Sequence, residues 1–239
     1  MKIRAIKTRV FNEGENLPAF ILEHLPKVEE NSVLAITSKI VSLSEGRTAV
    51  NTKQNREDLI KKESDVVVKD SWFSIKDNII MPAGGIDESN AQGKLIMLPK
   101  DSFKSAKIIR QSLKKKLKIK NLGVLITDSN FLPLRSGAIG IALGYAGFRG
   151  IRNYIGKEDI FGRKLKYSKT NIPDSLATAA VLCMGEGDEK QPLALITDAP
   201  AVFKEKVNTN ELRINPKKDM FYPILKNLFY EKKKSKARK

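Results

Sequence analysis

Three segments of the sequence place carboxylate, hydroxyl and amide oxygens directly after a short apolar run or a helical pattern. They are "PAGGIDESN" (82–90), "LITDSN" (125–130) and "CMGEGDEKQP" (183–192). Such oxygens suit Mg²⁺ or Mn²⁺, which take few protein ligands and complete their coordination with phosphate and water. Glycines beside the acids, as at Gly185 and Gly187, let backbone N–H groups approach an anion closely. Each segment alone is also a common turn or cap sequence. Together they favour a metal–nucleotide site.

Two further segments supply cations or close backbone approach. "TSKIVSLSEGR" (37–47) follows an apolar run, and its Lys39 could meet a phosphate as a point charge while Arg47 could clamp one with two donors. An exposed polar loop is the alternative for this segment. "LRSGAIGIALGYAGF" (134–148) carries glycines inside a strand pattern, which indicates close approach of either a ligand or a neighbouring strand.

The single histidine and the single cysteine exclude several kinds of chemistry. His24 and Cys183 are the only residues of their types. A Ser-His-Asp triad would therefore have to use His24, and a His-rich metal site, a Cys-based metal site and an internal disulfide are excluded. His24 stands near the end of a helical pattern, where a capping or surface role is expected. The sequence also lacks G-x-x-x-x-G-K-[ST] and a strand followed by G-x-G-x-x-G. Any chemistry therefore depends on carboxylates, lysines, arginines and backbone amides.

The net charge of +17 is concentrated in two lysine-rich runs, "KKKLKIK" (114–120) and "KKKSKARK" (232–239). The first ends a helical pattern that begins near Asp101, where lysines oppose the negative end of the helix dipole. The second is expected to be a disordered tail. Neither run interleaves aromatic residues, so nucleic acid is an unlikely partner, although a non-enzymatic polyanion-binding module stays the alternative of a different class.

The elements that must position these residues are short strands and amphipathic helices. Val- and Ile-rich runs predict strands at 33–37, 65–68, 78–81, 94–98, 122–127, 138–143 and 193–197. Helical spacing predicts helices at 17–25, 102–117, 173–184 and 222–228. Strands and helices do not alternate strictly, so the expected class is α+β or mixed α/β. No linker precedes the basic tail, which predicts one catalytic region over 1–230, with two subdomains as a variant, and a tail over 231–239.

The start of the chain and its longest apolar run indicate no membrane segment. "MKIRAIKTRVF" carries charge where a signal peptide needs an apolar core, and the run 137–148 is short and broken by glycines. We expect a cytoplasmic protein with no membrane partner.

Taken in order, these segments resemble the coenzyme F420-0:L-glutamate ligase family, whose members use GTP to add glutamate to a deazaflavin precursor. The resemblance runs from about residue 9 to 197. It is carried by "SKIVSLSEGR", "AGGIDESN", "ITDSN", "LRSGAIGIALGYAG", "IGKEDIFGRKL" and "MGEGDEKQP". It implies an α+β homodimer, intertwined, with the active site near the subunit interface.

The resemblance also implies roles for the matching positions. Asp87 and Asp128 would hold one divalent ion, and Ser129, where the family more often has threonine, would help Glu186 hold a second. Nucleotide contacts would come from Ser38, Lys39, Asn90 and the loop 184–191, with Met184, Gly185, Gly187 and Gln191. Lys39, Arg47 and Arg135 would hold the anionic substrates, and we count Arg135 with Asp87 and Asp128 as catalytic.

The implied reaction needs no histidine. A substrate carboxylate attacks the γ-phosphate of GTP or ATP, and the amine of L-glutamate then displaces phosphate from the acyl phosphate. Two departures from the family pattern concern the substrates: Leu43 replaces a lysine, and "SNFLPLR" lacks a Gly-Arg pair while keeping Arg135. The acceptor can therefore be the deazaflavin or a pterin, as in folate glutamylation.

Overall fold

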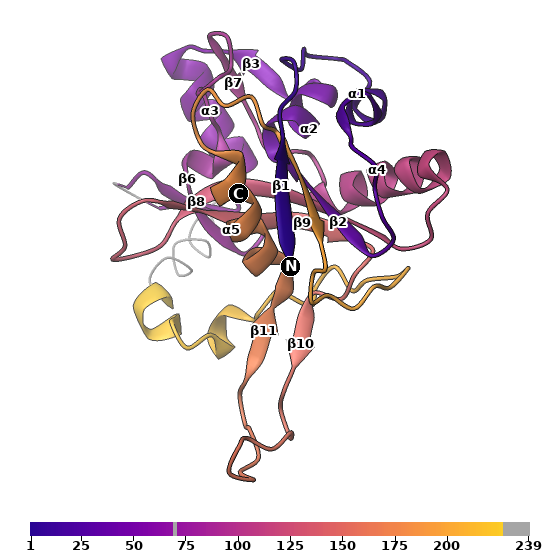
Figure 1. Cartoon of the computed structure of the whole chain (residues 1–239). Coiled ribbons are helices and arrows are strands. Elements are labelled where there is room, and N and C mark those ends of the chain that lie inside the picture. The colour runs from indigo at the N-terminus through magenta and orange to yellow at the C-terminus, as the bar shows by residue number, and fades with distance from the viewer. Residues whose placement is uncertain (69–70, 227–239) are drawn as a thin grey trace. The chain divides into compact units, whose positions relative to one another are not determined.

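The largest sheet of the protein contains one parallel pair of strands among antiparallel ones. In the computed structural model, which describes residues 1–68 and 71–226, its strand order is β1–β12–β2–β8–β9 (Figure 1). The strands span Lys2–Ile6 (β1), Leu193–Thr197 (β12), Ser32–Thr37 (β2), Leu122–Phe131 (β8) and Ala138–Ala146 (β9). Among these five, β2 and β8 are parallel, with Thr37 opposite Thr127. The expected mixed α/β class is confirmed.

Both faces of this sheet are covered, and successive residues of β2 show it. Leu34 and Ile36 belong to one core cluster, whereas Val33 and Ala35 belong to the other. The helices are α1 (Leu17–His24), α2 (Ser38–Ser44), α4 (Ser102–Leu117) and α5 (Ile172–Met184). The first three contribute to the cluster with Leu34, and α5 contributes to the other. Burial on both faces explains why the strands read as unbroken apolar runs.

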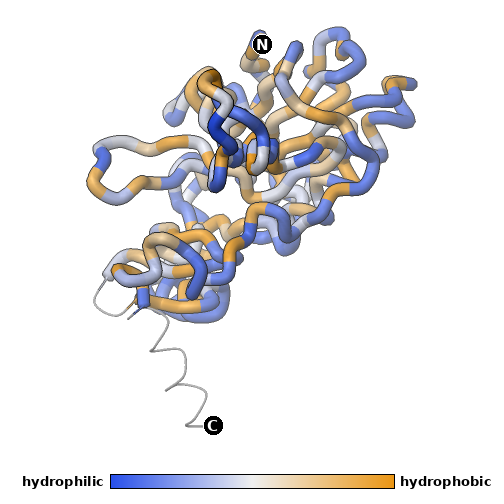
Figure 2. The backbone as a smooth tube through the Cα atoms, turned by 90° about the horizontal axis from the view of Figure 1, so that it is seen from below, coloured by the Kyte–Doolittle hydropathy of each residue, from blue (hydrophilic) through white to orange (hydrophobic). Residues whose placement is uncertain are grey.

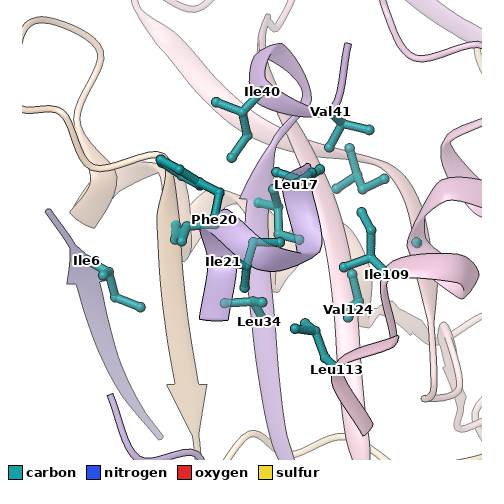
Figure 3. Packing of buried hydrophobic residues seen from close by; sticks show 14 of the residues in the cluster. Ile6, Leu17, Phe20, Ile21, Leu34, Ile40, Val41, Ile109, Leu113 and Val124 are labelled. Carbon is teal, nitrogen blue, oxygen red and sulfur yellow. The ribbon is translucent and has the colours of Figure 1, made fainter. Parts of the chain in front are cut away.

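Helix α1 illustrates the packing of the first cluster. Leu17, Phe20 and Ile21 are at most 3% exposed. Figure 3 shows them gathered with Leu34 of β2, and with Ile109 and Leu113 of α4 nearby. Burying each such side chain stabilises the fold by about 1.5–3 kcal/mol relative to an exposed one. This packing anchors the strands whose ends carry the polar residues of interest.

Polar side chains cap the starts of helices α4 and α5. The Asp101 side chain accepts a hydrogen bond from Lys104 N at 2.9 Å at the start of α4. Asn171 does the same for Asp174 N at 3.1 Å, with a proline in the first turn of α5. Three lysines occupy the last turn of α4, as expected for the first basic run. His24 lies in the last turn of α1, where its Nδ1 is 2.8 Å from Phe20 O.

The chain divides into two compact units. One comprises Met1–Gly46 and Pro99–Leu212, and it contains the five-stranded sheet and a hairpin, β10 (Ile151–Asn153) and β11 (Lys169–Asn171), that projects beyond that sheet (Figure 1). The other comprises Arg47–Leu98 and the segment from Arg213. Its strands are β3 (Thr48–Val50) with β7 (Lys94–Ile96), and β4 (Val66–Val67), β5 (Phe73–Lys76) and β6 (Ile79–Pro82). Its helical elements are α3 (Lys53–Glu63) and the 3₁₀ turns η1 (Ala83–Gly85) and η2 (Pro216–Lys218).

Several local features differ from the sequence-based prediction, and strands β1, β3, β5, β10 and β11 were not predicted at all. Residues 38–44 form helix α2, where a polar loop was the alternative considered, and residues 53–63 form a helix that was not predicted. Strand β8 does not end at residue 127 but continues through Phe131. It continues because β9 keeps pairing with it after β2 has ended, across a register shift between Ile126 and Thr127.

Hydrophobic and hydrophilic stretches are interspersed along the described chain (Figure 2). None of the helices in that part of the chain is both long enough and apolar enough to cross a membrane. The predicted basic tail, 232–239, and the end of the predicted helix 222–228 lie outside the described residues, and residues 222–226 are helical.

Candidate active site

The parallel pair β2–β8 brings Ser38 and Asp128 together. Thr37 and Thr127 lie opposite each other, and Ser38 and Asp128 are the next residues along the two chains. The Ser38 hydroxyl donates a hydrogen bond to Asp128 Oδ1 at 3.1 Å. Ser38 is only 4% exposed. In open α/β sheets, ligands bind outside the carboxyl ends of parallel strands, and this pair lies at such an end.

A second pair joins the next residue of β8 to the loop after α5. The Ser129 hydroxyl lies 2.7 and 2.9 Å from the two carboxylate oxygens of Glu186. Helix α5 ends at Met184, and Gly185 has φ 82° and ψ 171°. That conformation is accessible essentially only to glycine, and it directs the following acid to β8.

Asp128 and Ser129 therefore present their side chains to opposite faces of β8. Successive strand residues alternate in direction, and the contacts agree: Asp128 meets a residue of α2, whereas Ser129 meets the residue that follows the Gly185 cap of α5. The strand thus carries two separate oxygen pairs at one end. The expectation that these residues follow the end of the strand was wrong, since both belong to β8.

Backbone hydrogen bonds to β7 and side-chain contacts within the loop hold the acidic loop of the second unit in place. Asp87 N donates to Ile96 O at 2.9 Å, and Ile96 N donates to Asp87 O at 2.8 Å. Ser89 contacts the Asp87 carboxylate through its N–H at 2.7 Å and through its hydroxyl at 2.9 Å. The predicted glycine turn before the loop is confirmed as η1, with φ of 66° and 74° at Gly84 and Gly85. Asn90 is exposed and also has a positive φ, 52°.

The neighbouring acid, Glu88, points to different partners. Its carboxylate accepts hydrogen bonds from Arg56 and from Asn51 Nδ2, the latter at 2.9 Å. The Arg56 guanidinium, followed by the Asn51 amide, holds the pKa of Glu88 below its usual range. The loop thus contains two adjacent carboxylates with separate surroundings.

Arg47 occupies an ionic cluster inside the second unit. Its Nε donates to Leu98 O at 3.1 Å and its Nη2 to Glu63 Oε2 at 2.6 Å, and Lys76 Nζ reaches the same oxygen at 2.6 Å. Burial would raise the pKa of Glu63, whose side chain is 11% exposed, but its bonds to Lys76 and Arg47 lower it. Removing Arg47 would leave a nearly buried carboxylate with one partner fewer. The structure thus assigns Arg47 a structural contact, and phosphate binding by Arg47 stays a prediction.

The other predicted site residues are placed as follows. Lys39 is half-buried in the first turn of α2, and Arg135 is exposed in the connection between β8 and β9. Met184 is 5% exposed, and its side chain packs in the core cluster on the α5 face. Gln191 is half-buried just before β12.

Sequence reasoning missed residues that support the site. Glu189 accepts a hydrogen bond from Gly187 N at 2.8 Å and so closes the loop that carries Glu186. Arg56 and Asn51 were missed because helix α3 was not predicted. The signal was present in Thr52, which caps Asn55 N at 3.1 Å and is followed by strong helix formers.

The oxygen donors fit a divalent cation of the Mg²⁺ or Mn²⁺ type. Within the described residues, no group of three or more His, Cys, Asp or Glu side chains gathers around one point. Mg²⁺ does not require such a group, because it is bound by one or two carboxylates together with water and phosphate. Asp128 with Ser38, and Glu186 with Ser129, each provide a carboxylate beside a hydroxyl.

The chain is also similar to proteins of known function. Residues 49–198 match the F420-0:gamma-glutamyl ligase family. The chain is 33% identical over 215 residues to the coenzyme F420:L-glutamate ligase of Methanococcus maripaludis (strain C6), which covers 81% of this chain and 86% of that protein. It is 31% identical over 226 residues to the enzyme of the same name from Methanocaldococcus jannaschii, covering 85% and 90%. For the one from Methanopyrus kandleri, the identity is 32% over 209 residues, covering 78% and 82%.

The mixed α/β fold and the two carboxylate–hydroxyl pairs on β8 define a protein with a polar site at one end of its five-stranded sheet. The matches place it more narrowly: the chain belongs to the F420-0:gamma-glutamyl ligase family.

Proposed function

We propose that this protein is a nucleotide- and divalent-metal-dependent ligase that joins a substrate carboxylate to the amine of L-glutamate. The observation that carries the proposal is the pair of oxygen clusters at one end of β8, Ser38 with Asp128 and Ser129 with Glu186. They occur in a chain whose relatives are named coenzyme F420:L-glutamate ligases.

The reaction would proceed in two displacements. The acceptor carboxylate attacks the γ-phosphorus of GTP or ATP, the bond to the β-γ bridging oxygen breaks, and the nucleoside diphosphate leaves. The glutamate amine then attacks the acyl carbon, phosphate leaves and the amine loses a proton. Two bound Mg²⁺ or Mn²⁺ ions would supply neutralisation of phosphoryl charge. The chain's own task is to hold the anions in line at fixed positions.

Different residues would hold the two ions and the nucleotide. Asp87 and Asp128 would hold one ion, and Ser129 and Glu186 the other. The placement of Asp128 and Ser129 on opposite faces of β8 supports two separate ion positions. The nucleotide would contact Ser38, Lys39, Asn90 and the loop 184–191.

The acceptor that we propose is the deazaflavin precursor F420-0, since the relatives are named coenzyme F420:L-glutamate ligases. A pterin acceptor would use the same carboxylate-to-amine step and is a second substrate to offer. We also propose that the protein works as a homodimer in the cytoplasm. Light scattering of the purified protein should then give twice the chain mass of 26.7 kDa, and the mass of one chain would contradict the dimer.

Isosteric substitution of the two aspartates tests the proposed site. Asp128→Asn and Asp87→Asn remove a charge without changing shape, so we expect glutamate-dependent phosphate release to fall at least about 100-fold, with the melting temperature close to that of the wild type. Asp58→Asn, on the exposed surface of α3, is the control and should retain full activity. Full activity of either Asp128→Asn or Asp87→Asn would overturn the proposed site.

A further inference from the structure

The junction between β3 and α3 holds the side chain of Glu88 in a fork. Arg56 Nη1 donates to Glu88 Oε1 at 3.3 Å, and Arg56 Nη2 donates to Oε2. Asn51 Nδ2 donates to the same Oε2 at 2.9 Å. Arg56 Nη2 also reaches Asn51 Oδ1 at 3.2 Å, so the two donors are tied to each other as well as to the acid. Both oxygens of Glu88 are therefore bound from one side.

The same small ladder of strands fixes the backbone of Asp87. Ile96, which exchanges two hydrogen bonds with Asp87, is the last residue of β7. Strand β7 pairs with β3, where Ile96 lies opposite Thr48. Asn51 follows β3 directly, and Arg56 belongs to the helix that comes next. The main chain of Asp87 and the side chain of Glu88 are thus attached to one frame.

The fork contributes little to the stability of the fold. The side chains of Arg56 and Glu88 are 38% and 51% exposed, and exposed ion pairs contribute about 0–1 kcal/mol. A planar guanidinium that binds both oxygens nevertheless fixes the orientation of a carboxylate. The effect of the fork is therefore geometric, and it acts on the residue beside Asp87.

We propose that Arg56 and Asn51 are positioning residues: by holding Glu88 they orient Asp87 toward a divalent cation and keep Glu88 from binding it. This inference rests on the proposed function, in which Asp87 is a metal ligand. Outer partners that orient a ligand commonly change metal affinity by about 10–100-fold when they are removed. Ser89, the residue after Glu88, donates hydrogen bonds to both carboxylate oxygens of Asp87 and so also helps to fix the orientation of that carboxylate.

A positioning role and a purely electrostatic role predict opposite changes in cation affinity when Arg56 is removed. If only charge mattered, removing the Arg56 cation would strengthen cation binding and removing the Glu88 anion would weaken it. If the fork positions Asp87, removing either member weakens cation binding. Replacing Arg56 by lysine separates the two further, because lysine keeps the charge and loses the planar fork.

The test is the affinity of the full-length protein for Mn²⁺ alone, measured by the electron paramagnetic resonance signal of free Mn²⁺. We expect Arg56→Gln, Arg56→Lys and Glu88→Gln each to weaken binding by about 10-fold or more. The double variant Arg56→Gln/Glu88→Gln should be no weaker than either single variant, because the two residues act as one unit. Lys61→Gln removes the same charge from the last turn of α3 and should bind Mn²⁺ as the wild type does.

Several results would overturn the inference. Tighter binding by Arg56→Gln, or wild-type binding by Arg56→Lys, would show that charge and not geometry matters. Melting temperatures within about 2 °C of the wild type are expected for the three single variants, and a large drop would make the fork a structural contact. Asp87→Asn is measured beside them, because it separates failure of the positioning role from failure of the metal assignment. If Asp87→Asn weakens Mn²⁺ binding and the fork variants do not, only the positioning role fails. If Asp87→Asn binds normally, the metal assignment of the proposed function fails with it.

Discussion

At the scale of residues, the chemistry depends on acids whose partners come from distant parts of the sequence. Asp128 meets Ser38 and Ser129 meets Glu186, although 90 and 57 residues separate the members of these pairs. Residue types and their place after an apolar run or a helical pattern were enough to single out these acids as candidates. The contact of Ser38 with Asp128 could not be read from the sequence, because it follows from the parallel neighbours β2 and β8. The association of Ser129 with Glu186 was implied only by the family resemblance, and the structure shows the two in contact. The ion pair of Arg47 with Glu63 was missed because it, too, depends on how the chain folds.

The charge of Glu205 allows a prediction of pH dependence. Arg110, which is nearly buried, donates from two nitrogens to the two oxygens of Glu205 at 2.8 Å, and Lys114 adds a third contact at 2.9 Å. The Arg110 guanidinium, followed by Lys114, lowers the pKa of Glu205 to about 2 from its usual 4.5. The folded state therefore favours the charged form. Its contribution is present above pH 4.5 and is lost as the pH falls toward 2.

Glu205→Gln should reveal this contribution. Because the Glu205 side chain is 65% exposed, solvent screening limits the loss to about 1 kcal/mol at pH 7. Urea unfolding at several pH values should show the difference from the wild type narrowing between about pH 5 and pH 3. A difference that stays constant over this range would mean that the charge of Glu205 is not its source.

At the scale of elements, predictions succeeded where an apolar pattern and a cap coincide. Helix α4 was predicted with its observed bounds, and β12 likewise, since each is an apolar stripe or run with clear ends. Helix α3 was not predicted because it buries none of its residues, so hydrophobic periodicity gave no signal for it. Helix α2 failed because Thr37 makes no side-chain cap bond and the helix is only 7 residues long. Strand β8 was predicted too short because its polar end is paired with β9.

The glycine after α5 should be essential for the direction of the loop. Gly185 has φ 82°, and a Cβ there would collide with the Glu189 carboxylate. Gly185→Ala therefore costs about 1–3 kcal/mol of local strain and should displace Glu186 from Ser129. We expect phosphate release to fall at least about 10-fold, because misplaced ligands slow a reaction that depends on positioning.

Gly187→Ala is the matched control in the same loop. Its added Cβ would make only an ordinary contact with Glu189 at 3.4 Å, and its φ is not positive. It should retain most of the activity. Equal losses in the two variants would show that the loop tolerates no side chain at all, and that the backbone conformation of Gly185 is not the reason.

At the scale of the whole molecule, the residues predicted for the site are distributed over two compact units of the chain. The unit with the large sheet contains Asp128, Ser129 and Glu186, and the other contains Asp87 and Asn90. The sequence indicated one region over 1–230, with two subdomains as a variant, since no linker marks the points where the chain passes between the units at residues 46–47 and 98–99. The mixed fold class was predictable from the order of runs. The division into units was not, because it depends on which strands pair.

The net charge of +17 is the whole-molecule property that supports the alternative to a ligase, a polyanion-binding protein. Deleting residues 232–239 removes six of these charges and none of the residues assigned to the site. We expect ligase activity to stay unchanged, while retention on a heparin column shifts to lower salt. If the deletion abolished ligation, the basic segment would be part of the catalytic machinery.

The central claim is the formation of an amide with L-glutamate, and mass spectrometry of the acceptor tests it most directly. The purified protein is incubated with L-glutamate, Mn²⁺, either GTP or ATP, and either F420-0 or a pterin with a free carboxylate. The account predicts an F420-0 product heavier by one glutamyl residue, formed only with a nucleotide and not by Asp128→Asn. Absence of a glutamyl product from both acceptors, with a folded protein and both nucleotides, would contradict it.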